Sequence, residues 1–137
     1  MKNLRFLLLT FLVSVNILLI KSQTGYFYSS DKYLSNSLIN CIYQDSRNYI
    51  WIATEDGLNK YDGVRFSIYH ADKNDKLSIK NNSVHTVFED SKGRFWVGCI
   101  NGLMLYNRAE DTFIEIPIYF HNKLVTPHIS SIIETKQ

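Results

Sequence analysis

One segment of this chain is repeated, without a gap, 45 residues further along. Residues 34–62 read LSNSLINCIYQDSRNYIWIATEDGLNKYD, and residues 79–107 read IKNNSVHTVFEDSKGRFWVGCINGLMLYN. Seven aligned pairs are identical, and most of the others keep their polar or apolar character. The same shift places residues 124–134 on the start of the unit. Repeats of 40–50 residues made of short β-strands are typical of propellers and solenoids, so the chain is predicted to be all-β.

Each copy is predicted to form a four-stranded antiparallel meander, the unit known as a propeller blade. The second strand of each copy contains IWIA or FWVG, which is apolar on both faces. A strand of this kind is typically covered on both sides, as happens when blades stack around a ring. The predicted strands are 39–44, 49–54, 58–61 and 64–69 in the first copy, and 84–89, 94–99, 103–106 and 113–118 in the second.

The residues that recur between the copies are interpreted as structural. Asp side chains at the start of a turn accept backbone N–H groups, and Gly or Asn at its end tolerates the left-handed conformation. The two tryptophans occupy equivalent mid-strand positions. We expect them to pack between blades, although a sugar-stacking platform is the alternative. The predicted structural residues of the repeat are Asp45, Trp51, Gly57, Asp90, Gly93, Trp96 and Gly102.

The first 22 residues have the layout of a secretory signal peptide, predicted to be helical. A short basic start precedes an apolar run at 6–20, which is shorter than the ~20 residues of a membrane-spanning helix. An uncleaved N-terminal anchor is the alternative reading. Three of the 15 basic residues lie in this segment, which leaves 12 against 13 acidic residues. An exported, periplasmic protein is therefore expected, with no membrane span beyond the signal peptide and no nucleic-acid partner for this segment.

The predicted organisation follows the repeat. It comprises a signal peptide at 1–22, an outer closing strand and lead-in at 23–33, a first blade at 34–78, a second blade at 79–123, and the first strand of a truncated third repeat at 124–137. Two blades do not close a ring, so the propeller is predicted to be incomplete and the chain to be an N-terminal fragment.

No catalytic, metal or cofactor motif is recognised in the sequence. Cys41 and Cys99 invite a disulfide in an exported protein, but each also fits as a small buried apolar residue of a strand. The four histidines show no metal-ligand spacing. Glu55 and Asp56 could form a carboxylate pair, yet the second copy has isoleucine and asparagine there, which favours a turn role.

The candidate ligand-binding residues lie in loops. In a propeller, the loops that enter the innermost strand and the loops that join the second and third strands open on one face. Here these loops are 35–38, 54–56, 81–83 and 99–101, and they are rich in Asn, Ser and Asp. Such side chains suit hydrogen bonding to a polar ligand. The predicted ligand-binding residues are Asn36, Glu55, Asp56, Asn81, Asn82 and Asn101.

The repeat resembles that of the two-component-regulator propeller family. The resemblance covers residues 23 to 137 and is carried by residues 45–46, 50–54, 56–59 and 61–63 of the first copy, and by 90–93, 96–98 and 102–103 of the second. The departures are Asn48 and Ala53 in place of glycines, and Cys99 in place of threonine.

The resemblance implies the periplasmic sensor region of a hybrid two-component histidine kinase. Family members carry two many-bladed propellers, a β-sandwich, a membrane helix and a kinase, and they sense oligosaccharides to regulate transcription. By this resemblance the partners are an oligosaccharide ligand, the remaining blades and, in the full-length sensor, a second copy in a homodimer. No catalytic activity is expected in this segment. The alternatives are an exported propeller enzyme that acts on polysaccharide, and an adhesion or scaffold module.

Overall fold

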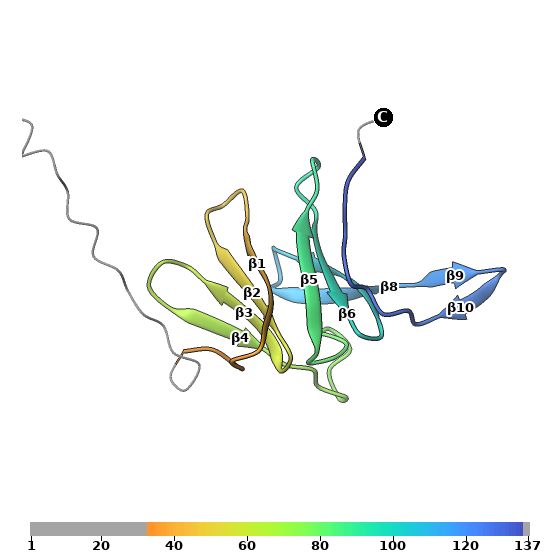
Figure 1. Ribbon diagram of the computed structural model, residues 1–137, viewed down its shortest axis with the longest axis horizontal. Coiled ribbons are helices and arrows are strands. Elements are labelled where there is room, and N and C mark those ends of the chain that lie inside the picture. The colour runs from red at the N-terminus through yellow and green to blue at the C-terminus, as the bar shows by residue number, and fades with distance from the viewer. Residues whose placement is uncertain (1–32, 136–137) are drawn as a thin grey trace, which may run out of the picture.

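The computed structural model describes residues 33–135 of the 137 residues. The expected signal peptide and nearly all of the expected lead-in at 23–33 lie outside the described residues. Within the described part there is no helix, and the strands form two four-stranded sheets and one hairpin, as Figure 1 shows. The all-β prediction is confirmed.

The two large sheets are antiparallel meanders with strand orders β1-β2-β3-β4 and β5-β6-β7-β8. The registers of their first three strands match after the 45-residue shift, and both sheets carry a β-bulge in the innermost strand. The outermost strand β8 is displaced by two further residues, because the β7–β8 turn is longer than the β3–β4 turn. Blade 1 consists of β1 (Ile39–Gln44), β2 (Ile50–Thr54), β3 (Gly57–Tyr61) and β4 (Phe66–Tyr69), and blade 2 of β5 (Val84–Glu89), β6 (Phe95–Cys99), β7 (Gly102–Asn107) and β8 (Thr112–Ile116).

The turn after each innermost strand is held by an aspartate. Asp45 Oδ1 accepts the backbone N–H groups of Arg47 and Tyr49, and its Oδ2 accepts Trp51 Nε1–H at 2.9 Å. The equivalent Asp90 accepts the same set of groups in blade 2, from the residues 45 positions later. Asn48 closes the first of these turns with a φ of 66°, a left-handed conformation that Asn tolerates.

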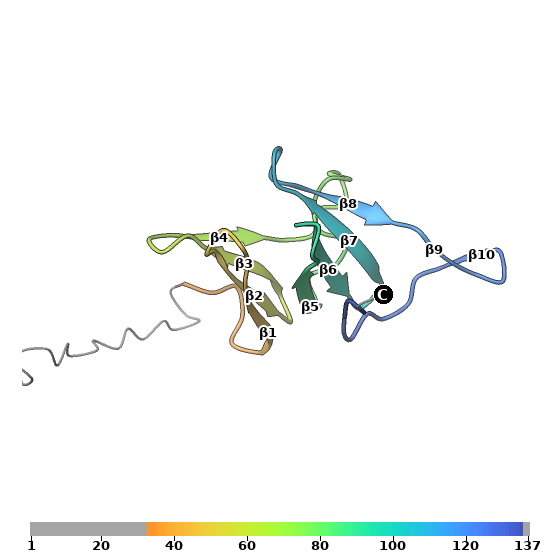
Figure 2. The same ribbon diagram turned by 90° about the horizontal axis from the view of Figure 1, so that it is seen from above.

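The two sheets lie side by side and bury their facing sides against each other, as Figures 1 and 2 show. Trp51 is fully buried, with its ring centroid 4.4 Å from that of Phe95 and 4.9 Å from that of Tyr106. The core also contains Ala53, Leu58, Ile79, Val84, Val87, Val97, Cys99, Met104 and Phe113. Cys41 and Cys99 are free, and burial raises the pKa of the Cys99 thiol to about 11.

A lysine is enclosed in this aromatic interface. Lys60 Nζ lies 4.7 Å from the ring centroid of Tyr49 and 5.3 Å from that of Trp51, and it donates to Tyr106 Oη at 2.8 Å. Burial alone would lower the pKa of Lys60. The Tyr106 hydroxyl and the Asp111 carboxylate, 3.6 Å away, instead raise this pKa above its ordinary value. The charged form is thus held between the blades by cation–π and polar contacts.

Polar contacts join the blades at the end where the aspartate turns lie. Glu89, the last residue of β5, accepts the backbone N–H and the hydroxyl of Ser46 at 2.6 and 2.8 Å. Arg108, in the turn between β7 and β8, donates to Asp45 at 2.8 Å and to Glu89 at 3.0 Å. These charged side chains are almost completely buried. One arginine of blade 2 therefore binds a turn of blade 1.

The chain after β8 differs from the expectation. We predicted a strand through residue 118, but β8 ends at Ile116, because Pro117 has no N–H to donate to a ladder. A hairpin of β9 (Ile118–Phe120) and β10 (Lys123–Val125) follows, with left-handed residues at its His121-Asn122 turn. The first strand of a third repeat was expected at 124–137. Residues 124 and 125 instead belong to β10, and residues 126–135 are not assigned to a strand.

Residues 126–135 nevertheless contact blade 2 in a way that repeats the contact between the blades. Ile129 N–H donates to the carbonyl oxygen of Cys99 at 3.0 Å, and Glu134 accepts the backbone N–H and hydroxyl of Ser91. The Glu134–Ser91 pair is the Glu89–Ser46 pair shifted by 45 residues. Residues 126–135 therefore lie against blade 2 as the innermost strand β5 lies against blade 1. No second strand pairs with them among the described residues.

Acid is expected to destabilise the fold through its aspartates. Burial alone would raise the pKa of Asp90, but hydrogen bonds from Trp96 and Arg94 lower it from 3.8 to about 2. A depressed carboxylate pKa stabilises the fold above the pKa of the unfolded chain, and this contribution is lost as protons bind the folded state. We expect the free energy of unfolding, measured with urea, to fall between pH 4 and pH 2.

The variant Asp90→Asn is the control for this titration. It should be less stable than the parent at pH 6 and should show a shallower decline toward pH 2. Equal stability of the parent chain at pH 6 and pH 2.5 would contradict the prediction.

Candidate functional site

The candidate site is one end of the two blades, which we call the loop face. It is formed by the turn between β2 and β3, the turn between β6 and β7, and the segments that lead into β1 and β5. Backbone hydrogen bonds connect these loops. Gly57 N–H donates to the Asn82 carbonyl oxygen at 2.7 Å, and Ile100 N–H donates to the Ser83 carbonyl oxygen at 3.1 Å. All six predicted ligand-binding residues lie on the loop face.

Two of these residues shape the segments that lead into the innermost strands. Asn36 Oδ1 accepts the backbone N–H of Leu38 at 2.8 Å, and Asn81 Oδ1 accepts that of Ser83 at 2.9 Å. These are the same Asx-type turn in each repeat, which explains why asparagine recurs there. In both cases the side-chain carbonyl oxygen is used locally.

Glu55 joins the two blades. Its carboxylate accepts Ser83 Oγ–H at 2.7 Å and Asn40 Nδ2–H at 2.9 Å, and Asn40 also donates to the Val84 carbonyl oxygen. The hydrogen bonds from Ser83 and Asn40, together with the nearby histidines, lower the pKa of the Glu55 carboxyl below its ordinary value. Glu55 is therefore an ionised hydrogen-bond acceptor near neutral pH.

Asp56 and Asn82 form a second contact across the loop face. Asp56 Oδ1 accepts Asn82 Nδ2–H at 2.8 Å, while Asn82 Oδ1 accepts the backbone N–H of Ala71 at 2.7 Å. The adjacent Gly57 has a φ of 123°, and a Cβ there would lie 2.9 Å from the carbonyl oxygen of Tyr69. Glycine is thus required sterically at this turn. The structure brings Glu55, Asp56 and Asn82 into one connected network.

Asn101 differs from the other candidates. Its Oδ1 is buried and accepts no hydrogen bond from the described residues. A buried acceptor without a donor costs free energy, so this oxygen is an unsatisfied polar atom of the loop face. The structure places Asn101 in the turn between β6 and β7, apart from the Glu55–Asn82 network.

Sequence reasoning missed two histidines on this face. His85 Nε2 lies 3.0 Å from Ser83 Oγ, and the ring of His85 lies 4.2 Å from that of His128 in the segment 126–135. Neither residue has a motif spacing, and their proximity depends on the packing of residues far apart in the sequence. Within residues 33–135, no group of three His, Cys, Asp or Glu side chains is placed to hold a metal ion.

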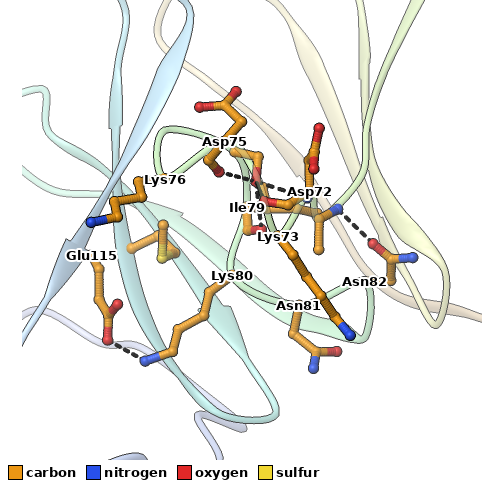
Figure 3. A pocket seen from close by; sticks show the side chains of 12 residues that line it. Asp72, Lys73, Asp75, Lys76, Ile79, Lys80, Asn81, Asn82 and Glu115 are labelled. Carbon is orange, nitrogen blue, oxygen red and sulfur yellow. Dashed lines mark hydrogen bonds and ion pairs between the residues drawn. The ribbon is translucent and has the colours of Figure 1, made fainter.

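Sequence reasoning also missed a groove beside the loop face. The segment between β4 and β5 curves over blade 2 and borders an open groove of about 820 Å³, shown in Figure 3. Its polar lining holds three lysines and three carboxylates as well as uncharged groups: Asp72, Lys73, Asp75, Lys76, Ser78, Lys80, Asn81, Asn82 and Glu115. We call it the lysine groove. The sequence marked this segment only as a polar connection between blades.

The fold and the repeat define the class of this protein. Two stacked four-stranded meanders, related by a 45-residue shift and packed face to face, are blades of a β-propeller. Residues 33–56 and 78–101 match the model of the two-component regulator propeller family. Each match covers the first part of one blade, so both blades are similar to the repeat of this family, and the resemblance is confirmed.

Two known proteins are similar to parts of the chain. A histidine kinase of Formosa agariphila, "Histidine kinase P4", is 46% identical over 46 residues, which are 34% of this chain and 3% of that protein. The extracellular domain of a putative hybrid two-component system from B. thetaiotaomicron matches with a TM-score of 0.63 and 28% identity, over 75% of this chain and 15% of that one. The chain thus spans a small part of the length of either protein.

Among residues 33–135, no helix has the length and apolar character that crossing a membrane requires.

Proposed function

We propose that this chain forms part of the extracellular ligand-sensing propeller of a hybrid two-component system, and that it contributes to oligosaccharide binding. The observation that carries the proposal is the match to the extracellular domain of such a system, at 28% identity over 75% of this chain. The match of both blades to the regulator propeller repeat supports it. An exported, periplasmic location follows from this role.

The loop face supports binding as its role rather than catalysis. The carboxylates of Glu55 and Asp56 accept hydrogen bonds from side chains of the next repeat, at 2.7 and 2.8 Å. Such carboxylates are fixed in position, which suits a site that recognises hydroxyl groups by hydrogen bonding. Asn101 supplies an acceptor without a partner among the described residues.

The partners proposed for the chain are further blades and, in the full-length sensor, a second copy in a homodimer. Large apolar side chains at the open side of blade 1 support the first of these. Ile42 is 63% exposed and Ile68 is 44% exposed, whereas Val87, the blade 2 equivalent of Ile42, is buried in the interface with blade 1. A neighbouring blade would cover this surface in the same way.

Calorimetric titration of the purified full chain with neutral and acidic oligosaccharides tests the function. We expect at least one oligosaccharide to bind and to be recovered intact. The variant Asn101→Ala should weaken that binding about fivefold, because a hydrogen bond to a ligand is worth about 1 kcal/mol. The control Asn107→Ala changes the asparagine that ends β7 and should leave affinity unchanged.

Two results would contradict the proposal. Shortened saccharide products, detected by chromatography, would favour an enzyme that acts on polysaccharide. The absence of binding by every oligosaccharide tested would favour an adhesion or scaffold role.

A further inference from the structure

Two histidines from different repeat units meet on the loop face. The ring centroid of His85, in β5, lies 4.2 Å from that of His128, in the segment 126–135, with 56° between the ring planes. His85 is half-buried and His128 is exposed, so water reaches the pair. Imidazole is the side-chain group that commonly changes charge between about pH 5 and pH 8. The contact therefore joins two groups that become positive as the medium becomes acidic.

The equivalent contact between blade 1 and blade 2 contains no histidine. After the 45-residue shift, Asn40 is equivalent to His85 and Ser83 is equivalent to His128. Asn40 and Ser83 both donate to the carboxylate of Glu55, at 2.9 and 2.7 Å. Blade 2 has Ile100 at the position of Glu55, so it supplies no carboxylate there. The histidine pair is thus particular to the second junction and is not needed to build a blade.

The carboxylate of Glu55 is the negative charge close to both rings. Hydrogen bonds from Ser83 and Asn40, together with the two histidines, lower the pKa of this carboxyl, so Glu55 stays ionised in mildly acidic solution. The neighbouring Asp56 carboxylate accepts a hydrogen bond from Asn82 and lies 4.0 Å from His70 Nδ1. Glu55 can therefore offset one positive charge on the pair.

The other titratable groups beside the pair do not add a second negative charge. Lys80, in the segment that leads into β5, is paired with Glu115. Cys99, whose carbonyl oxygen accepts the N–H of Ile129, has a thiol pKa raised by burial to about 11, so this thiol is neutral. Two protonated rings would consequently carry one charge more than Glu55 offsets.

The hydrogen bond of His85 is compatible with both of its charge states. Ser83 donates its hydroxyl proton to Glu55, so Ser83 Oγ accepts the Nε2–H of His85 at 3.0 Å. Proton uptake by His85 then occurs at Nδ1, and the bond to Ser83 is kept. The ring of His85 is therefore held in place while its charge changes.

Few contacts hold the segment 126–135 on blade 2, beside which it runs in Figure 1. Ile129 N–H donates to the carbonyl oxygen of Cys99 at 3.0 Å, and an added Cβ at Gly98 would lie 2.6 Å from Ile129 Cγ2. Glu134 accepts two hydrogen bonds from the turn after β5. Among the described residues no strand ladder includes this segment. A repulsion between two side chains is therefore large relative to what holds it.

We propose that His85 and His128 form a pH-sensitive contact, which holds the segment 126–135 on blade 2 near neutral pH and releases it when both rings are protonated. Two positive rings at this separation repel each other, and Glu55 offsets only one of them. The released segment binds both protons without this repulsion, so release is linked to proton uptake and increases as the pH falls. The inference concerns the junction between repeat units and does not depend on which ligand is bound.

Hydrogen exchange of the full chain between pH 7.5 and pH 5.0, corrected for the intrinsic pH dependence of exchange, tests the inference. We expect protection of the Ile129 amide to fall about tenfold, the order expected for two unit charges about 4 Å apart near a protein surface. The Gly57 amide, which donates to Asn82 at the first junction, should change by less than about twofold. Constant protection of Ile129 would overturn the proposal, and so would an equal loss at Gly57, which would indicate general unfolding.

The residues of the first junction supply the matched variant. In His85→Asn/His128→Ser, protection of the Ile129 amide should vary by less than about twofold over the same pH range. His128→Ser alone leaves one ring and should also lose most of the response. The control His121→Asn removes a histidine from the β9–β10 turn, where asparagine tolerates the left-handed conformation, and it should keep the full response. Circular dichroism checks that each variant is folded.

Glu134 is the other titratable residue of the segment 126–135. The variant Glu134→Gln should lower the protection of Ile129 at every pH and keep its pH dependence. Loss of the pH dependence in this variant would assign the response to Glu134 and overturn the proposal. A response in the double histidine variant as large as that of the parent chain would overturn it as well.

Discussion

Replacing Trp51 with alanine is expected to lower the free energy of unfolding by about 3–5 kcal/mol. Trp51 is fully buried between the blades, where its ring contacts Phe95 and Tyr106. Its Nε1–H is also a donor to the buried Asp45. The substitution therefore opens a cavity in the interface and removes one donor from a buried carboxylate, and both effects destabilise the fold.

The matched control is Trp96→Ala at the equivalent position of blade 2. Trp96 donates to Asp90 at the same distance, 2.9 Å, but its side chain is only partly buried. The expected loss is about 1–2 kcal/mol, which represents the hydrogen bond and partial burial. Urea unfolding of both variants measures the difference. Equal losses would mean that packing between the blades does not distinguish the two tryptophans.

Replacing Arg108 with alanine is expected to cost about 3–5 kcal/mol, because it leaves buried carboxylates without their cation. The Arg108 side chain is 12% exposed, that of Asp45 is 0% exposed and that of Glu89 is 7% exposed. The interaction joins a turn of blade 2 to a turn of blade 1. The loss should therefore appear as weakened contact between the blades, visible as faster hydrogen exchange in β1 and β5.

Arg94→Ala is the control for Arg108. Arg94 pairs with Asp90 at 2.6 Å, but its side chain is 49% exposed and the pair lies within one turn. Exposed pairs of this kind contribute about 0–1 kcal/mol. A double variant Asp45→Asn/Arg108→Met should recover part of the stability that Arg108→Ala loses, because no buried carboxylate then remains opposite the lost cation at Asp45. No recovery would contradict this account of the buried ion pair.

The internal repeat made most of the fold predictable. Two aligned copies located the strands to within one or two residues in most cases, because turn residues and apolar runs recurred together. The prediction was wrong at Pro117, where a strand was carried through a residue that cannot donate to a ladder. The β9–β10 hairpin was also missed, because it has no counterpart in the first copy.

The interactions between the blades could not be predicted from the sequence. Arg108 binds Asp45 across 63 positions, and the lysine groove depends on how the β4–β5 segment curves over blade 2. Such contacts are set by the stacking of sheets rather than by local patterns. Loop polarity located Glu55, Asp56 and Asn82 on one face, but it did not indicate that these side chains hydrogen-bond across repeats.

The contacts of residues 126–135 have a consequence for the order in which such a molecule folds. Ile129 and Glu134 bind blade 2 although no strand of their own sheet pairs with them among the described residues. A completed blade thus supplies the surface on which the first strand of the following unit is laid down. Assembly can then advance from the amino-terminal blade toward the carboxyl terminus, one nearest-neighbour step at a time, as the chain becomes available.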